Sequence, residues 1–256
     1  MLRSLTQRLT AGLLDRVDRH RKAVQLAAEA RALQRDCASD DRLESLVDLV
    51  LASARFRPSQ KRAEILGLLE IVQASGARTI CEIGAAKGGT LALLAHAVPS
   101  ATRILSIDIR YNRAKRKAYP RLVRAGQRVT CVNASSYDPG TLANVRRWLG
   151  GERLDFIFID GDHSLDGVSR DFEAYWPLVR EGGIIAVHDI VPDYRTRYGR
   201  ETDSNTGEVP LFWRQLKPHG LEMRELIENP DQDGYGIGVM WKRAETPPAL
   251  PATSAV

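Results

Sequence analysis

Apolar positions recur at intervals of three and four residues through the first part of the chain. In residues 1–57 this spacing places apolar side chains along one face of a helix, so it predicts an N-terminal helical extension. After a break at Pro58 and Ser59, a further helix runs to a stop near Gly76. These helices have three possible roles. They pack against the rest of the chain, form contacts between copies of the chain, or act as a substrate lid. The apolar face is formed by Leu2, Leu5, Leu9, Leu13, Val17, Leu43, Leu46, Val47 and Val50.

From residue 78 the pattern changes to short apolar runs that alternate with helix-like segments. The runs are rich in Ile, Val and Phe and mostly uninterrupted, as in strands buried on both faces. Strand–helix alternation predicts an α/β fold with a doubly wound, mostly parallel sheet. The predicted strands are Thr79–Ile83, Ile104–Ile107, Val129–Val132, Phe156–Ile159, Ile184–Val187 and Gly236–Trp241. The predicted helices between them are Thr90–Ala97, Tyr111–Arg124, Gly140–Leu149 and Gly167–Leu178.

This pattern divides the chain into the helical extension 1–57, an α/β domain 58–243 and a tail 244–256. The tail is rich in Pro, Ala and Thr, a composition typical of disorder. The longest mostly apolar stretch, Thr90 to Val98, is far shorter than the roughly 20 residues of a membrane span, so we expect none. Three widely spaced cysteines are too few for a disulfide framework, which favours a reducing cytoplasm.

A glycine-rich turn joins the first predicted strand to its helix. It reads Cys81-Glu82-Ile83-Gly84-Ala85-Ala86-Lys87-Gly88-Gly89-Thr90. Glycines let the backbone approach a ligand closely, and the N–H groups of the following helix then face it. Asp108, at the end of the second strand, can accept both hydroxyls of an adenosine ribose. These features alone fit two ligands, a dinucleotide and S-adenosylmethionine (SAM).

Carboxylates and histidines follow the fourth and fifth predicted strands. The fourth runs into Asp160-Gly161-Asp162-His163, and the fifth runs into His188-Asp189. Ligands bind outside the carboxyl ends of strands in doubly wound sheets, so these side chains are expected to meet there. Three carboxylates and two imidazoles in one place repel or neutralise one another unless a cation or acid/base chemistry uses them.

Two sets of motifs resemble known methyltransferases. The loop reads G-x-x-x-G-G with Glu82 two residues before its first glycine, which departs from the dinucleotide motif and resembles class I SAM-dependent methyltransferases. The segments FIDGDH (158–163) and GGIIAVHDI (182–190) resemble a family that includes bacterial O-methyltransferases of macrolide sugars and cephalosporin-hydroxylase-like proteins. The likeness covers roughly Ser59 to Trp241.

The resemblance implies a seven-stranded Rossmann-like sheet, SAM as cofactor and a small-molecule hydroxyl as methyl acceptor. The acceptor class it implies is a sugar, oligosaccharide or polyketide-type metabolite. The acid that such enzymes carry after the third strand is Ala134 here, which leaves Ser135 and the backbone to contact adenine. The implied cofactor-binding residues are Glu82, Gly84, Lys87, Gly88, Gly89, Thr90, Asp108, Ser135 and Asp160.

The resemblance also implies a divalent cation and a histidine base. In the family, Mg²⁺ is held by the acid that ends the fourth strand and an acidic pair that ends the fifth, and these positions correspond to Asp160 and Asp189. The family's base corresponds to His163. His188 stands where the family has an acid, and imidazole is a poor ligand for Mg²⁺. Three outcomes stay open: Mg²⁺ with fewer protein ligands, a softer ion such as Mn²⁺ at Asp160, His188 and Asp189, or no metal with His188 as a second acid/base group.

A long polar segment lies between Ile190 and Gly207. A loop of this length beside strand ends is usually functional or mobile. We read it as a substrate lid in which Tyr194 and Tyr198 stack on a sugar or other ring, with a connector as the alternative. Asp162 is a further candidate substrate contact, or a solvated turn residue.

Other function classes stay open beside the methyltransferase. They are an NAD-type oxidoreductase on the same fold, and a non-catalytic SAM-binding or scaffold protein that assembles through residues 1–57.

The net charge of +5 comes from one stretch of the chain, because residues 109–128 carry eight basic residues and no acid. This stretch is either a solvated helix face or a surface that binds an anionic acceptor or partner. We expect no nucleic-acid partner, and a homo-oligomer through the N-terminal helices is possible.

Overall fold

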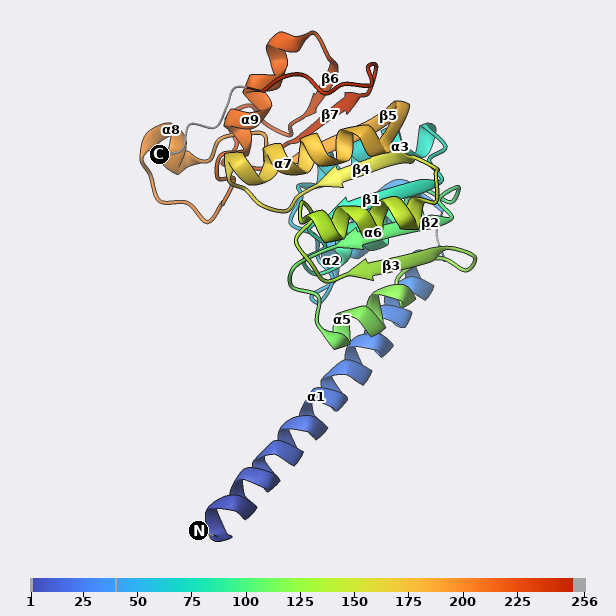
Figure 1. The fold of residues 1–256 in the computed structure, drawn as a ribbon, viewed down its shortest axis with the longest axis vertical. Coiled ribbons are helices and arrows are strands. Elements are labelled where there is room, and N and C mark those ends of the chain that lie inside the picture. Colours follow the sequence, from blue (N-terminus) through green and yellow to red (C-terminus); the bar gives the residue numbers. More distant parts are fainter. Residues whose placement is uncertain (1, 40, 251–256) are drawn as a thin grey trace.

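The computed structural model describes residues 2–39 and 41–250, with side chains from residue 16 onward. Seven strands form one sheet in the order β3-β2-β1-β4-β5-β7-β6 (Figure 1). The first five strands in this order pair parallel with one another, while β7 pairs antiparallel with both β5 and β6. The predicted doubly wound, mostly parallel seven-stranded sheet is therefore confirmed. The strands are β1 Thr79–Ile83, β2 Arg103–Ile107, β3 Arg128–Val132, β4 Leu154–Ile159, β5 Val179–His188, β6 Glu222–Leu226 and β7 Ile237–Trp241.

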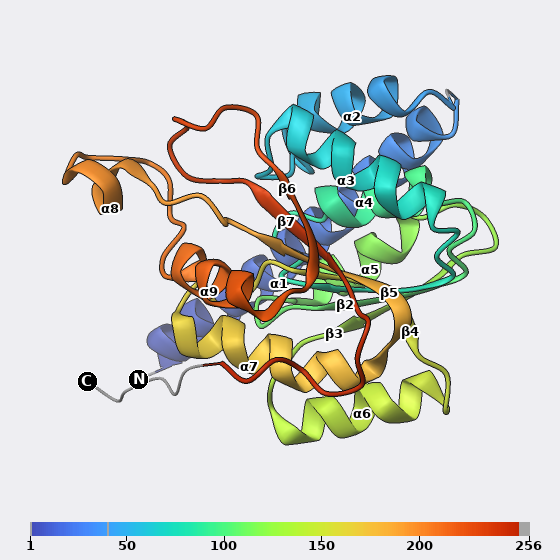
Figure 2. The same ribbon diagram turned by 90° about the horizontal axis from the view of Figure 1, so that it is seen from above.

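Helices cover both faces of the sheet, and each face has its own apolar core (Figure 2). One face carries α1 Leu2–Cys37, α2 Leu43–Ala52, α3 Arg62–Ala74, α4 Gly89–Ala97 and α5 Arg113–Ala118. The other carries α6 Pro139–Leu149, α7 Leu165–Tyr175 and α9 Val209–Leu216. Short 3₁₀ turns follow three of these helices, at Tyr119–Arg121, Trp176–Leu178 and Lys217–His219. Strand β1 lies at the centre of the sheet and is buried throughout, as its uninterrupted apolar run predicts.

Three elements differ from the sequence prediction. The helix expected at Tyr111–Arg124 is wrong in extent: α5 is shorter because Asn112 caps it and Pro120 lacks the N–H that would continue it. Strand β6 was not predicted, because it lies at the sheet edge with mostly exposed positions and reads as polar. The polar segment after Ile190 contains a short helix, α8 Tyr194–Tyr198, capped by Asp193.

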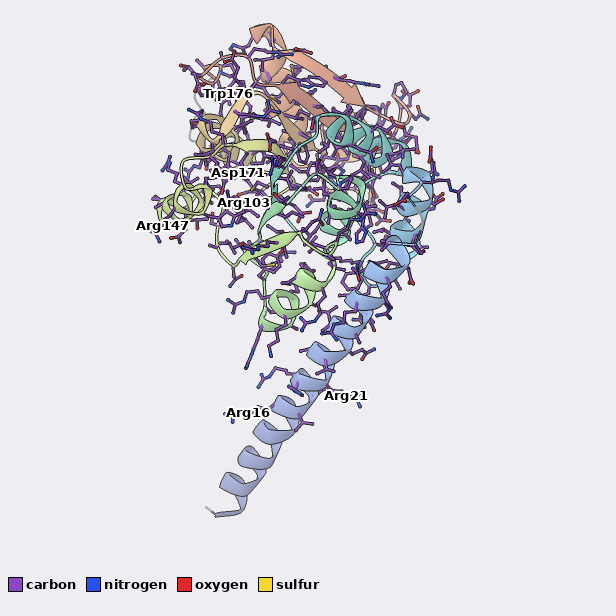
Figure 3. All side chains as sticks on the ribbon, turned by 90° about the vertical axis from the view of Figure 1, so that its right-hand side faces the viewer. Arg16, Arg21, Arg103, Arg147, Asp171 and Trp176 are labelled. Carbon is purple, nitrogen blue, oxygen red and sulfur yellow. The ribbon has the colours of Figure 1, made fainter. Side chains whose placement is uncertain are left out.

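The N-terminal half of α1 extends away from the sheet, and Arg16 and Arg21 lie on this projecting part (Figure 3). Assembly of copies through these helices stays a prediction, as do the domain limits 1–57, 58–243 and 244–256. In residues 2–39 and 41–250 we find no helix with the length and apolarity needed to cross a membrane. The last part of the predicted tail, 251–256, lies outside the described residues; Ala244 at its start accepts a hydrogen bond from Trp176 Nε1.

Candidate active site

A cavity of about 950 Å³ lies where the parallel strands β1, β2, β4 and β5 end. This is the edge at which the sequence predicted that the functional side chains meet. The glycine-rich loop contributes Gly84 and Ala86 to its lining, and the segment that follows α8 contributes Asp203, Ser204 and Asn205. The predicted site residues that line it are Gly84, Asp108, Ser135, Asp160, Asp162, His163, His188 and Asp189.

Gly84 brings the glycine-rich loop against the end of β4. Its φ is +88°, and a Cβ on it would lie 1.8 Å from the carbonyl oxygen of Asp160. Only glycine combines this backbone conformation with so close an approach. The Asp108 carboxylate accepts hydrogen bonds from the backbone N–H of Ala86 (2.8 Å) and of Arg110 (2.5 Å), which hold it at the cavity wall.

The other predicted cofactor residues support this loop without lining the cavity. Glu82 is fully buried and accepts a hydrogen bond from Ser106 Oγ at 2.7 Å, and burial raises the pKa of its carboxyl to about 8. Gly88 is the N-cap of α4 with a φ of +84°, and Gly89 packs against the backbone of Phe56. Lys87 is exposed and Thr90 is buried. Contacts of Glu82, Lys87, Gly88, Gly89 and Thr90 with a cofactor stay predictions that rest on the resemblance.

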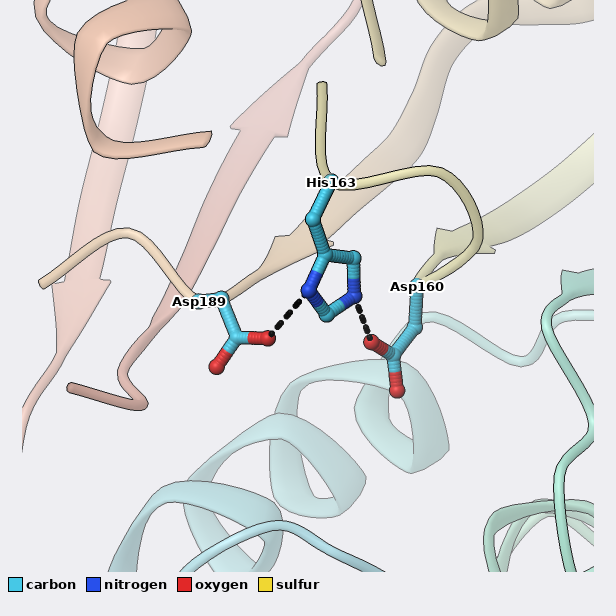
Figure 4. A group of neighbouring side chains, drawn as sticks. All are labelled: Asp160, His163 and Asp189. Atoms are coloured by element: carbon cyan, nitrogen blue, oxygen red, sulfur yellow. Dashed lines mark ion pairs between the residues drawn. The ribbon is translucent and has the colours of Figure 1, made fainter. Parts of the chain in front are cut away.

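Among the residues that line the cavity, one imidazole lies between two carboxylates (Figure 4). His163 Nε2 is 3.5 Å from Asp160 Oδ1, and His163 Nδ1 is 3.5 Å from Asp189 Oδ2. Nδ1 also lies 2.6 Å from the carbonyl oxygen of Asn205, which can only accept a hydrogen bond. One ligand atom from each of Asp160, His163 and Asp189 falls within 4.8 Å of the others, a spacing that suits a metal ion.

His188, a second imidazole in the cavity lining, contacts the same two carboxylates. Its Nδ1 lies 3.2 Å from Asp160 Oδ1 and 3.3 Å from Asp189 Oδ2. Its Nε2 has no hydrogen-bond partner among the residues that the structure describes, although the side chain is only 3% exposed. Both His188 and Asp189 reach the cavity because β5 ends at His188 and Asp189 has a φ of +64°, so the strand's alternation of sides stops there.

The two carboxylates and two imidazoles of this cluster lie close enough for their charges to affect protonation within the cluster. Burial alone would raise the pKa of Asp160, but the neighbouring imidazoles outweigh burial and lower it to about 2. Contact with Asp160, together with the charge of Asp189, raises the pKa of His163 to about 9. Burial lowers the pKa of His188, but both carboxylates raise it by more. The charges of two carboxylates and two protonated imidazoles sum to zero. One divalent cation beside the two carboxylates and two neutral imidazoles would give the same net charge.

Gln60 is a site residue that the sequence analysis missed. It is 4% exposed, and its Nε2 donates to Asp160 Oδ2 at 2.9 Å. Its Oε1 accepts a hydrogen bond from Thr90 Oγ1 at 3.0 Å. This chain of contacts fixes the amide and leaves Asp160 Oδ1 facing the imidazoles. No motif marks Gln60, because it reaches Asp160 from a hundred residues away.

The predicted substrate residues fall into two groups. Asp162 lines the cavity, accepting hydrogen bonds from Tyr137 Oη (3.1 Å) and Ser164 N–H (3.0 Å). Tyr194 and Tyr198 pack against each other on α8, outside the cavity lining, and Tyr194 Oη donates to the carbonyl of Asp231. The polar segment still lines the cavity through Asp203, Ser204 and Asn205, and Gly207 and Glu208 after it also belong to the lining. Contact of Asp162, Tyr194 and Tyr198 with substrate stays a prediction.

A buried carboxyl outside the cavity, Asp171 on α7, gives a test of stability against pH. Both of its oxygens lack a hydrogen-bond partner in the part of the chain that the structure describes, and burial raises its pKa to about 7. A raised carboxyl pKa means that folding favours the protonated form, so this group lowers stability as pH rises from about 4 through 7. We expect Asp171→Asn to raise the free energy of unfolding by roughly 1–3 kcal/mol at pH 8 and by little at pH 4.5.

Urea unfolding at the two pH values measures this difference. The matched control is Asp166→Asn, which changes an exposed carboxylate on the same helix, paired with Arg170. A gain for Asp171→Asn that is equal at both pH values would show that the buried carboxyl does not titrate in this range.

Known proteins resemble this chain in sequence and in fold. Residues 81–190 match the family described as a methyltransferase domain. The demethylmacrocin O-methyltransferase of Streptomyces fradiae is 30% identical over 112 residues, which are 44% of this chain. This chain spans 27% of the length of that relative.

Among solved structures, the O-methyltransferase TomG of Streptomyces achromogenes, in complex with SAM, has a TM-score of 0.57 at 19% identity. The O-methyltransferase of Bacillus cereus, in complex with SAH, has a TM-score of 0.53 at 20% identity. Each match covers 80% of this chain and 92% of the other. At these identities the two structures show a shared fold. The chain therefore has the same Rossmann-like fold as these methyltransferases, and its residues 81–190 are similar to the methyltransferase-domain family.

Proposed function

We propose that the protein is a SAM-dependent O-methyltransferase that methylates a hydroxyl of a small molecule. One observation carries the proposal. A single cavity joins a glycine-rich loop and a carboxylate suited to a ribose with a half-buried histidine set between two carboxylates. The family match supports methyl transfer over the NAD-type oxidoreductase, and a SAM complex in a protein of the same fold supports the cofactor.

Asp108 and Gly84 have the cofactor-binding roles in this proposal. The Asp108 carboxylate accepts the ribose hydroxyls, and the absence of a side chain on Gly84 lets the loop backbone approach the bound molecule. SAM supplies an activated methyl group when bound, so the protein's main contribution is to position the acceptor in line with it. Ser135, beside Ala134, lines the part of the cavity where the adenine is expected.

His163 is the proposed base. Its Nδ1–H donates to the Asn205 carbonyl. Because the carboxylates raise the pKa of His163, its Nε2 must first lose a proton before it can accept the proton of an acceptor hydroxyl, and a divalent cation on Asp160 and Asp189 would favour that neutral form. Asp160 and Asp189 then stabilise the imidazolium that forms, since each has an oxygen 3.5 Å from a ring nitrogen. Gln60 holds Asp160 in the orientation that this role needs.

A divalent cation is the second part of the proposal. Asp160 and Asp189 would hold it, with His188 as the nitrogen donor so that His163 stays available as the base. His188 Nδ1 lies 3.2 Å from Asp160 Oδ1 and 3.3 Å from Asp189 Oδ2, and a nitrogen donor favours Mn²⁺ more than it favours Mg²⁺. A bound divalent ion would lower the pKa of a hydroxyl next to it. Without an ion, His188 is a second acid/base group.

The proposed acceptor is a sugar, oligosaccharide or polyketide-type metabolite. The relative in Streptomyces fradiae, named for demethylmacrocin, supports this class. Tyr194, Tyr198 and Asp162 are the proposed substrate contacts from the segment after β5 and the end of β4. We place the reaction in the cytoplasm, since all three cysteines of the chain are unpaired thiols.

Titration and label transfer test the proposal together. Calorimetric titration is expected to show binding of SAM and no binding of NAD. Label from methyl-SAM is expected to appear in compounds of a bacterial metabolite extract, to fall at least tenfold with EDTA and to return with added Mn²⁺. Binding of NAD without SAM would support the oxidoreductase, and SAM binding without label transfer would support the non-catalytic alternative. Transfer that EDTA leaves unchanged would remove the metal from the proposal.

A further inference from the structure

Backbone strain in this protein is concentrated around the cavity. Among the described residues, three that are not glycine have a positive φ: Ala86 (+41°), Asp189 (+64°) and Tyr235 (+64°). All three line the cavity. A left-handed conformation is unfavourable for residues with a Cβ, and it persists where the surrounding contacts fix it, often at functional sites. Ala86 belongs to the cofactor loop and Asp189 to the acidic cluster, but nothing above assigns a role to Tyr235.

Tyr235 is held in place by a buried carboxylate from another layer of the fold. It stands between Gly234 and Gly236, which also have positive φ, at the end of the loop from β6 to β7. Glu64 on α3 is 1% exposed, and its Oε2 accepts a hydrogen bond from Gly236 N–H at 3.0 Å. Glu64 Oε1 accepts another from Gln232 Nε2 at 2.6 Å. These bonds fix the backbone on both sides of the tyrosine.

The loop from β6 to β7 is also hydrogen-bonded to the residues that directly follow β5. The backbone N–H of Val191 donates to the Tyr235 carbonyl at 2.9 Å, and that of Ile190 donates to the Gly236 carbonyl at 3.3 Å. Tyr235 therefore keeps a fixed position relative to Asp189, the residue before Ile190. Its ring centroid lies 6.2 Å from that of His188, in a T-shaped arrangement.

The ring of Tyr235 leaves part of its surface to the cavity. The side chain is half-buried, with His188 at one side and Lys61 Nζ 5.6 Å from the ring centroid. An aromatic ring that is fixed by its backbone and open to a cavity offers a flat apolar surface at little entropic cost. The tyrosines suggested for stacking by the sequence, Tyr194 and Tyr198, lie outside the cavity lining.

We propose that Tyr235 is a specificity-determining residue, whose ring stacks on a ring of the acceptor and so holds the hydroxyl beside the histidine and aspartate cluster. The inference rests on the proposed function and narrows its acceptor class to molecules with a sugar or aromatic ring beside the methylated hydroxyl. Glu64 is a positioning residue in this arrangement, because it acts through the backbone on either side of the tyrosine.

Two substitutions test the proposal. Tyr235→Gly removes the ring and accepts the positive φ without strain, while Tyr235→Phe keeps the ring and loses only the hydroxyl. The assay measures label transfer from methyl-SAM into a serially diluted, protein-free metabolite extract. We expect the extract concentration that gives half-maximal transfer to rise at least tenfold for Tyr235→Gly and to stay within threefold of wild type for Tyr235→Phe. The SAM dissociation constant and the thermal midpoint are expected to stay at wild-type values in both.

The possible outcomes separate this inference from the proposed function. If the wild type transfers no label, both are overturned. If the wild type transfers label and Tyr235→Gly shows the same dependence on extract, only the inference is overturned. A Phe variant as impaired as the Gly variant would assign the effect to the hydroxyl and overturn stacking. Joint loss of thermal stability and SAM binding in Tyr235→Gly would show a structural role instead.

Discussion

Replacing His163 with alanine is expected to lower the rate of methyl transfer by about two to four orders of magnitude, the usual contribution of a general base. A hydroxyl is a weak nucleophile until its proton leaves, and His163 Nε2 is the proposed proton acceptor. The SAM dissociation constant is expected to stay within about twofold of wild type, because the proposed cofactor contacts are made by Asp108 and the glycine-rich loop and not by His163. Rates at saturating SAM and calorimetric titration measure the two quantities.

Two further variants make this result specific. His163→Gln keeps a side chain that can donate to the Asn205 carbonyl but cannot take up a proton, so it is expected to be as slow as His163→Ala. His219→Ala changes an exposed histidine in the turn after α9 and is expected to leave the rate unchanged. Turnover at the wild-type rate in His163→Ala would remove His163 as the base and direct attention to His188.

The part of the site that could be predicted from sequence is the part that follows strand ends. Asp108 and Asp160 come directly after an apolar run and Asp189 one residue after its run, and parallel strands bring such positions to one edge of the sheet. The central strands could also be predicted, because they are buried on both faces and therefore form uninterrupted apolar runs in the sequence. Strand β6, at the edge, has no such pattern and was missed.

The residues that could not be predicted reach the site through tertiary contacts. Gln60 contacts Asp160, and Glu64 contacts Gly236, across separations of 100 and 172 residues. Neither contact leaves a local pattern, since one polar side chain near a helix start reads as an ordinary surface residue. Tyr235 had a weak signal in its two flanking glycines, which indicate an unusual turn. That signal gives the conformation of the turn but not the cavity that the ring faces.

The contacts of His188 with Asp160 and Asp189 also could not be predicted from the sequence. In the sequence, His188 is an imidazole in place of a carboxylate, which only weakens the case for Mg²⁺. In the structure, His188 and His163 together balance the charges of Asp160 and Asp189. With a histidine at position 188, the charges of the two carboxylates and two protonated imidazoles sum to zero, and the proposed divalent ion beside neutral imidazoles would give the same sum.

Gly84→Ala is expected to weaken SAM binding at least a hundredfold and to lower the free energy of unfolding by about 3 kcal/mol or more. The new Cβ would lie 1.8 Å from the backbone oxygen of Asp160, and backbone atoms cannot move aside as a side-chain tip can. The loop must therefore shift away from β4, and with it the backbone that is proposed to contact the cofactor. Thermal unfolding and calorimetric titration with SAM measure the two effects.

Gly126→Ala is the matched control for this substitution. Gly126 has a φ of +89°, nearly that of Gly84, but no described atom lies within 4 Å of the Cβ that it would gain. It therefore bears only the conformational cost, about 1 kcal/mol, and SAM affinity should not change. The difference between the two variants measures how much stability and cofactor affinity depend on the close approach of the loop to β4. Equal effects in both would mean that this approach does not shape the cofactor site, and that Gly84 is needed for its backbone conformation alone.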